Sequence, residues 1–207
     1  AYRKEDEEDQ ENHCKISCCE MSAWELPQSL TVGNKDWTIR SDFRVALDIL
    51  KYFGDPNYEE DEQWMICLDI LFEDFASMSP KLYQEACEKA RWFLDLGAEK
   101  AEETQSPALM TWEQDAGLII PAVNKVIGKE VRAIPYMHWW TFAGAYMEIG
   151  ESLFSQVLSI RQKKQKHQKL EKWEQEFYQK NRSMIDLKKR YSEEEKQKQK
   201  ELLALFD

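Results

Sequence analysis

One histidine and three cysteines crowd together near the start of the chain, as His13-Cys14 followed by Cys18-Cys19. Imidazole and thiolate groups are ligands that zinc prefers, but a closed zinc site needs four ligands, usually in two separated pairs. Here a single cluster lies in a polar segment, and no second pair completes the tetrahedron. We therefore expect neither a metal site nor a cofactor.

The three histidines, His13, His138 and His167, are the candidates for a general base. Strongly charged neighbours favour solvated side chains for the first and the third, and aromatic neighbours favour a buried structural imidazole for His138. A catalytic pair would require His138 to meet Cys67 or Cys87 in space, which sequence spacing does not establish. The seven glycines are scattered singly, without a phosphate-binding loop. We expect a protein without enzymatic activity.

The basic stretch 161–169, RQKKQKHQK, is the remaining candidate for binding chemistry. Its lysines, with Trp173 and Phe177 nearby, could follow a phosphate backbone and stack bases. However, Glu171, Glu174 and Glu176 follow at once and would repel phosphate. A solvated helix face is the favoured interpretation, and nucleic-acid binding stays an alternative.

Charge is distributed unevenly along the 207 residues, whose net charge is −11. Residues 1–160 hold 14 basic and 30 acidic residues, a net charge of −16, whereas residues 161–207 hold 14 basic and 9 acidic residues, a net charge of +5. This asymmetry favours a basic tail that meets an acidic surface or folds back on the acidic body.

Tryptophan is abundant, with eight residues, of which Trp112, Trp139, Trp140 and Trp173 lie in the second half. Such side chains fill cores and also anchor protein interfaces. Core packing is the default interpretation for any single one of them.

The apolar periodicity predicts a mainly α fold with a short N-terminal β-hairpin. Residues 29–40 form the expected hairpin, around Gly33-Asn34. Three amphipathic helices follow, and three helices in a row predict a bundle. The first is capped by Asp42 and ends at Gly54, the second spans about 59–76, and the third opens at Ser79-Pro80 and ends at Gly97.

Further helices are expected in the second half of the chain. A capping box at residues 111–114 starts one of them, which Pro121 kinks or restarts, and Pro135 opens the next, over 136–149. Two more helices are expected over 151–168 and 170–181. A second capping box at residues 192–195 opens a C-terminal helix with the apolar end 202–206, a possible docking anchor.

These elements predict five segments. They are a disordered acidic, Cys-containing leader (1–20), a hairpin with a three-helix bundle (21–97), a linker (98–110), an aromatic-rich helical region (111–181) and an extended basic helical arm (182–207). No apolar run is long enough to cross a bilayer and no secretory signal is visible. The odd, crowded cysteines argue against a disulfide framework, so we expect folding in a cytoplasm.

Three motifs in residues 112–185 resemble a known family: WEQDAGLIIPAVNKVIGKEVR, PYMHWWTFAGAYMEIGESLFSQVLSIRQKK and KLEKWEQEFYQKN. The chain resembles the gene-product-fifteen proteins of phages and prophages of Gram-positive bacteria, and LPQSLTVGNKDWTIRSDFRVALDIL is similar to that family's opening. The likeness spans roughly residues 26–187. The matching positions are Trp112, Glu113, Asp115, Ile134, His138, Trp139, Trp140, Phe142, Ile160, Arg161, Lys163, Glu176, Phe177 and Asn181.

Genes of this family typically lie between those of the major tail protein and the tape-measure protein. The resemblance therefore implies a phage tail-assembly chaperone in the bacterial host's cytoplasm, which binds the tape-measure protein, the major tail protein or both. It is also compatible with a homo-oligomer. The alternatives are a structural component retained in the tail and a nucleic-acid-binding accessory protein that uses residues 161–169. The hypothesised interaction residues are Trp112, Glu113, Asp115, His138, Trp139, Trp140, Phe142, Arg161, Lys163, Trp173, Glu176, Phe177 and Asn181.

Overall fold

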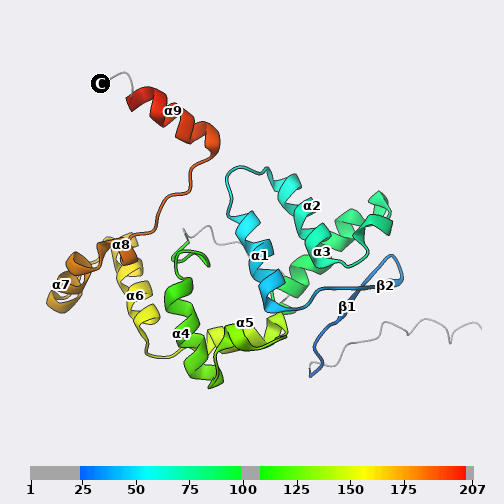
Figure 1. Ribbon diagram of the computed structural model, residues 1–207, viewed down its shortest axis with the longest axis horizontal. Helices are drawn as coiled ribbons and strands as arrows, with labels where there is room; N and C mark the ends of the chain where they lie inside the picture. Colours follow the sequence, from blue (N-terminus) through cyan, green and yellow to red (C-terminus); the bar gives the residue numbers. More distant parts are fainter. Residues whose placement is uncertain (1–23, 99–107, 204–207) are drawn as a thin grey trace, which may run out of the picture.

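The computed structural model describes residues 24–98 and 108–203 and is mainly helical, as predicted, with one antiparallel hairpin (Figure 1). The expected leader 1–20 and most of the expected linker lie outside the described residues. The helices are α1 (Phe43–Phe53), α2 (Glu60–Leu71), α3 (Tyr83–Leu94), α4 (Ala116–Ile127), α5 (Trp139–Met147), α6 (Leu153–Gln165), α7 (Lys172–Lys180), α8 (Arg182–Ile185) and α9 (Glu193–Leu203). Short 3-10 turns are η1 (Phe75–Ser77), η2 (Pro80–Leu82) and η3 (Val131–Ala133).

The hairpin pairs β1 (Ser29–Val32) with β2 (Lys35–Thr38), and Ser29 lies opposite Thr38. Gly33 and Asn34 make the two-residue turn with φ angles of 60° and 59°. Both residue types tolerate positive φ, which this type of hairpin turn requires. The predicted hairpin and its turn are confirmed.

The first bundle helix begins and ends where its capping residues predict. The Asp42 carboxylate accepts a hydrogen bond from the backbone N–H of Arg44 (2.9 Å), and Gly54 is the C-cap of α1. This carboxylate satisfies a backbone donor that the first helical turn leaves without a partner.

The second bundle helix ends at Leu71, so the expectation that it reaches Ala76 was wrong. The helix ends there because the next residue, Phe72, forms an isolated β-bridge with Ile39, which directly follows strand β2. The Arg40 guanidinium also donates to the carbonyls of Asp69 (3.0 Å) and Ile70 (2.7 Å). A cation on the last carbonyls of a helix satisfies acceptors that a longer helix would have used.

Two further helix starts differ from the sequence expectation. The turn at residues 111–114 precedes α4 without being part of it, and α4 continues through Pro121 instead of restarting there. Pro135 does not open α5, which begins at Trp139, because residue His138 pairs with Asp42 in a β-bridge and then caps the helix. At the start of α5, a contact distant in sequence therefore moves the boundary.

One apolar core includes residues from both sides of the 99–107 gap. Phe43 of α1 and Phe142 of α5 stack with ring centroids 4.5 Å apart, and both are buried. A second, small cluster consists of Val157 and Ile160 of α6 with Ile185 of α8. Helix α9 extends away from these layers (Figure 1), and Leu202 near its end is 58% exposed.

The hairpin turn yields a stability prediction. We expect Gly33→Ala to lower the free energy of unfolding by about 1–2 kcal/mol, because an L side chain is strained at this positive φ. An added Cβ would also come within 2.7 Å of Leu82 Cδ2. Urea denaturation would measure the change.

The matched control is Gly144→Ala in the interior of α5, where an added Cβ meets nothing within 4 Å. Alanine is the better helix former, so this change should raise stability by about 0.5–1 kcal/mol. Equal effects of the two substitutions would contradict the assigned turn conformation.

Candidate functional site

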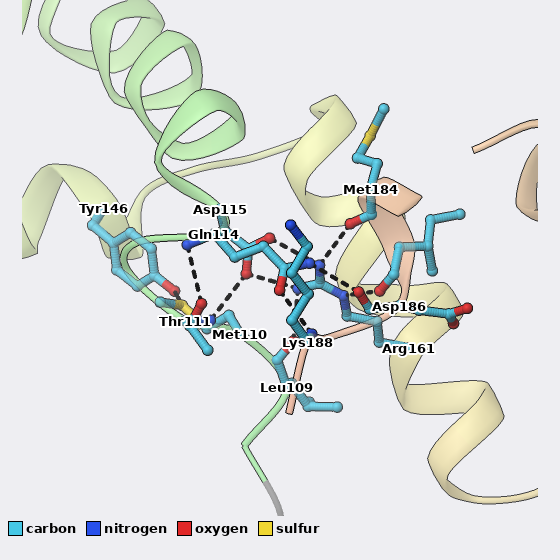
Figure 2. Close-up of polar contacts among 11 residues, drawn as sticks. Leu109, Met110, Thr111, Gln114, Asp115, Tyr146, Arg161, Met184, Asp186 and Lys188 are labelled. Carbon is cyan, nitrogen blue, oxygen red and sulfur yellow. Dashed lines mark hydrogen bonds and ion pairs between the residues drawn. The ribbon is translucent and has the colours of Figure 1, made fainter. Parts of the chain in front are cut away.

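A buried ion pair joins α6 to the segment that precedes α4 (Figure 2). The Arg161 guanidinium donates to both carboxylate oxygens of Asp115, at 2.7 Å and 2.8 Å. Both side chains are nearly inaccessible, with 5% and 1% exposure. This is the bidentate geometry in which arginine binds a carboxylate most strongly.

The same guanidinium uses its other three N–H groups on backbone carbonyls. It donates to Leu109 (3.0 Å), to Met184 (2.9 Å) and to Ile185 (2.6 Å), so all five of its donors are satisfied. Met184 and Ile185 lie at the end of the short helix α8, whose last carbonyls have no partner inside the helix. Arg161 therefore fastens three separate segments at one point (Figure 2).

His138 holds together the starts of the hairpin and of two helices. Its Nδ1 accepts the backbone N–H of Trp140 (3.1 Å) and thereby caps α5, and its Nε2 lies 2.9 Å from the carbonyl oxygen of Pro27. Because that carbonyl only accepts, Nε2 carries the proton. Burial lowers the pKa of His138 below its usual value, and the hydrogen bond to Pro27 opposes this shift.

The two tryptophans that follow His138 cap the end of another helix. The indole N–H of Trp139 donates to the Leu94 carbonyl (3.0 Å), and that of Trp140 donates to the Phe93 carbonyl (2.8 Å). Both acceptors lie in the last turn of α3. The His-Trp-Trp motif thus positions α5 against α3.

The candidate nucleophile Cys67 is buried in the core. Burial raises the pKa of its thiol to about 12, and the neighbouring Cys87 contributes in the same direction. A thiol of this kind holds its proton near neutral pH, whereas the thiolate is the nucleophile. Both ring nitrogens of His138 are engaged by backbone groups, as described above, so neither is free to act as a base on this cysteine.

The basic stretch is partly neutralised within the chain. Lys163 pairs with Glu174 (2.7 Å), and Lys164 pairs with Asp186. Burial opposes ionisation of Glu174, but hydrogen bonds from Lys163 and from the Glu171 backbone N–H hold the pKa of this carboxyl below its usual value. Lys163 and Lys164 therefore stabilise the packing of α6 against α7 and the loop after α8.

The structure separates the hypothesised interaction residues into core and surface. Those in the core are Asp115, His138, Trp139, Phe142 and Arg161. The contacts of these five buried side chains are with groups of the same chain, so in this structure they serve the fold. Those half-buried are Trp112, Trp140, Lys163, Phe177 and Asn181, and those exposed are Glu113, Trp173 and Glu176.

Glu113 has a structural partner despite its exposure. Its carboxylate pairs with Arg190, and Lys51 Nζ lies 3.4 Å from it. The Arg190 guanidinium also donates to the Lys51 carbonyl (3.1 Å). These contacts fold the chain that leads into α9 back on the body, one of the two outcomes that the charge asymmetry favoured.

An apolar groove between α4 and the start of α6 was missed by the sequence reasoning. Its volume is about 200 Å³, and its lining residues are Gly117, Leu118, Pro121, Ala122, Lys125, Glu151, Ser152 and Leu153. Leu153 is 44% exposed, and Val126, one turn beyond Ala122, is 41% exposed. The run LIIPAV in α4, which carries no charge on any face, was the signal available in the sequence.

The described residues also bear on metal sites and on membrane-spanning helices. Within residues 24–98 and 108–203, no three His, Cys, Asp or Glu side chains come together in a way that could hold a metal ion. The cluster of His13, Cys14, Cys18 and Cys19 lies outside these ranges. None of the helices described is both long and apolar enough to span a bilayer.

Comparison with known proteins gives one match. A family model described as bacteriophage Gp15 protein matches residues 24–191, which confirms the resemblance seen in the sequence. The match includes the hairpin, the His-Trp-Trp motif and the Arg161–Asp115 pair, and it ends before α9. No curated protein and no solved structure matches the chain significantly.

The buried ion pair yields a double-mutant prediction. We expect Arg161→Met to lower the free energy of unfolding by about 3–5 kcal/mol, because it leaves the Asp115 carboxylate buried without its cation. The double variant Asp115→Leu/Arg161→Met leaves no unpaired charge and should lose less than the sum of the single changes. Urea denaturation of Arg161→Met, Asp115→Leu and the double variant measures this coupling, and strictly additive losses would contradict it.

The buried imidazole yields a pH prediction. The folded chain binds a proton at His138 less readily than the unfolded chain, so stability should fall as the pH drops below about 6.5. Protonation at Nδ1 would also remove the acceptor for the Trp140 N–H. We expect His138→Asn, which keeps a capping oxygen, to flatten this part of the stability profile measured by denaturation. An unchanged slope in the variant would contradict the assignment.

Proposed function

Because the chain belongs to the bacteriophage Gp15 family, we propose that this phage protein is a tail-assembly chaperone. In this proposal it binds the tape-measure protein, and with it the major tail protein, in the cytoplasm of the bacterial host while the tail assembles. A tape-measure protein is a long helical chain with apolar faces, which would aggregate unless another protein covered them. The proposed function of this protein is therefore to bind the tape-measure polypeptide and later release it.

The groove between α4 and α6 is the observation that supports this function most directly. Partner helices dock in grooves by inserting apolar side chains spaced three or four residues apart. The groove is lined mainly by small or apolar side chains, and Leu153 and Val126 extend its apolar surface into solvent. The wall of the groove includes two charged residues, Lys125 and Glu151, and the Lys125 ammonium donates to the Glu151 carbonyl (3.4 Å).

We also propose that the protein catalyses no reaction. Two of the candidate reactive groups, His138 and Cys67, already serve the fold: one caps a helix and the other is a buried thiol. The nucleic-acid alternative has less support, because fewer cations of the basic stretch are free to bind phosphate than the sequence suggested. Arg161, Lys163 and Lys164 form ion pairs within the chain.

The groove yields a binding prediction. Leu153→Glu should reduce capture of the phage's tape-measure protein by about tenfold to a hundredfold, because the partner's apolar side chains would have to desolvate a carboxylate. Leu153 is the first residue of α6, where a negative charge suits the helix dipole, so the fold should survive. Pull-down after co-expression, with circular dichroism as the folding check, measures the effect.

The matched control is Met65→Glu, which places the same charge at a similarly exposed position (41%) on α2. This variant should capture the tape-measure protein as the unmodified chain does. Equal loss in both variants, or no loss with Leu153→Glu, would remove the groove from the proposal. A fixed copy number in purified virions would indicate the retained structural component instead.

A further inference from the structure

Pro121 occupies a position in α4 where proline costs stability. It is the sixth residue of the helix Ala116–Ile127, beyond the first turn in which proline is tolerated. Inside a helix, proline lacks the backbone N–H that would bind the carbonyl four residues earlier, and its ring presses against that carbonyl. A residue that breaks a local rule in this way is expected at functional or strained sites.

The carbonyl that loses its donor belongs to Gly117. A helix carbonyl points along the axis toward the residue four positions on, so this oxygen lies between Gly117 and Pro121. Both residues are exposed, and both line the α4–α6 groove. Gly117 has no side chain to cover the oxygen, and a Cβ added there would meet nothing within 4 Å. The groove therefore presents a backbone acceptor beside its apolar walls.

The polar groups of the neighbouring walls already have partners in the chain. The Ser152 hydroxyl accepts the backbone N–H of Ser155 (3.1 Å) and donates to the Ser155 hydroxyl (3.3 Å). The Lys125 ammonium donates to the Glu151 carbonyl (3.4 Å). These donors serve the start of α6 and the rim of the groove. A donor for the Gly117 carbonyl can come from water or, when water is expelled, from a bound partner.

A partner that covers the groove removes water from the Gly117 oxygen. An acceptor that loses its water and gains no donor raises the free energy of the complex, whereas a hydrogen bond from the partner avoids this cost. The difference corresponds to about tenfold in affinity. The groove can therefore discriminate between partner helices that are equally apolar.

We propose that Pro121 makes the Gly117 carbonyl the acceptor by which the α4–α6 groove selects its partner. The partner is a helix of the tape-measure protein that inserts a large apolar side chain and, one turn away, donates a side-chain N–H or O–H to this carbonyl. The groove, at about 200 Å³, has room for such a side chain, and helix residues three or four apart lie on one face. This inference rests on the proposed function, because it specifies what the groove binds.

The substitution Pro121→Ala tests this selection without weakening the fold. Alanine restores an N–H at residue 121, which pairs the Gly117 carbonyl within α4, so the midpoint of thermal unfolding should rise by about 5 °C. Capture of the tape-measure protein after co-expression should nevertheless fall about tenfold. The matched control Gly144→Ala also improves a helix, in α5, and should leave capture unchanged.

Overlapping peptides of the tape-measure protein locate the donor. Peptides that bind the unmodified chain should carry a large apolar residue and, three or four positions away, an N–H or O–H side chain. Replacing that donor by an apolar residue of similar size, such as glutamine by methionine, should weaken binding about tenfold. Against Pro121→Ala the same replacement should change binding by less than about twofold, because the carbonyl is no longer free. Fluorescence anisotropy measures the four affinities.

The outcomes separate this inference from the proposed function. Loss of capture by Leu153→Glu with full capture by Pro121→Ala would overturn the inference and leave the proposed function standing. An equal loss from the peptide replacement against both chains would also overturn it, because Pro121 would then act through the shape of α4. Full capture by both variants would remove the groove, and with it this inference.

Discussion

The packing of the C-terminal helices depends on the buried Arg161 guanidinium, whose five N–H groups all have acceptors. Among the described residues, the apolar cluster beneath these helices has three fully buried side chains, Val157, Ile160 and Ile185, with partly buried apolar side chains packed against them. Burial of these three side chains contributes on the order of 5–9 kcal/mol, which is opposed by the cost of ordering the helices. The ion pair with Asp115 fixes how α6 is oriented on the segment before α4, because a bidentate pair forms in only one relative orientation of the two side chains.

The main core depends on a second set of polar contacts, at the start of α5. There the three side chains of the His-Trp-Trp motif bind backbone groups of the hairpin entry, α3 and α5 itself. Within the described residues, every buried side-chain nitrogen or oxygen has a hydrogen-bond partner. The Arg161 contacts and the His-Trp-Trp contacts both place polar groups in apolar surroundings, where the loss of a hydrogen-bond partner costs the most free energy. Only an arrangement of the helices that keeps all these partners avoids this cost.

The motifs by which the family is recognised are therefore chiefly structural. His138, Trp139, Arg161 and Asp115 are buried, and their partners are groups of the same chain. The surface on which the proposed binding depends lies elsewhere, in the α4–α6 groove. Because these residues lie in the core, the motifs that contain them can be typical of a family without being part of the proposed binding surface.

The sequence by itself determined what depends on neighbouring residues. The hairpin turn at Gly33-Asn34, the cap at Asp42 and the capping box at residues 192–195 are local hydrogen-bond patterns, so they could be predicted. Tertiary structure decided the rest: where α2 ends, where α5 begins, and that Arg161 lies inside. Arg161 binds Asp115 across 46 positions of sequence. Sequence reasoning predicts that a charged side chain is solvated, because only a partner that the fold brings to it offsets the cost of its burial.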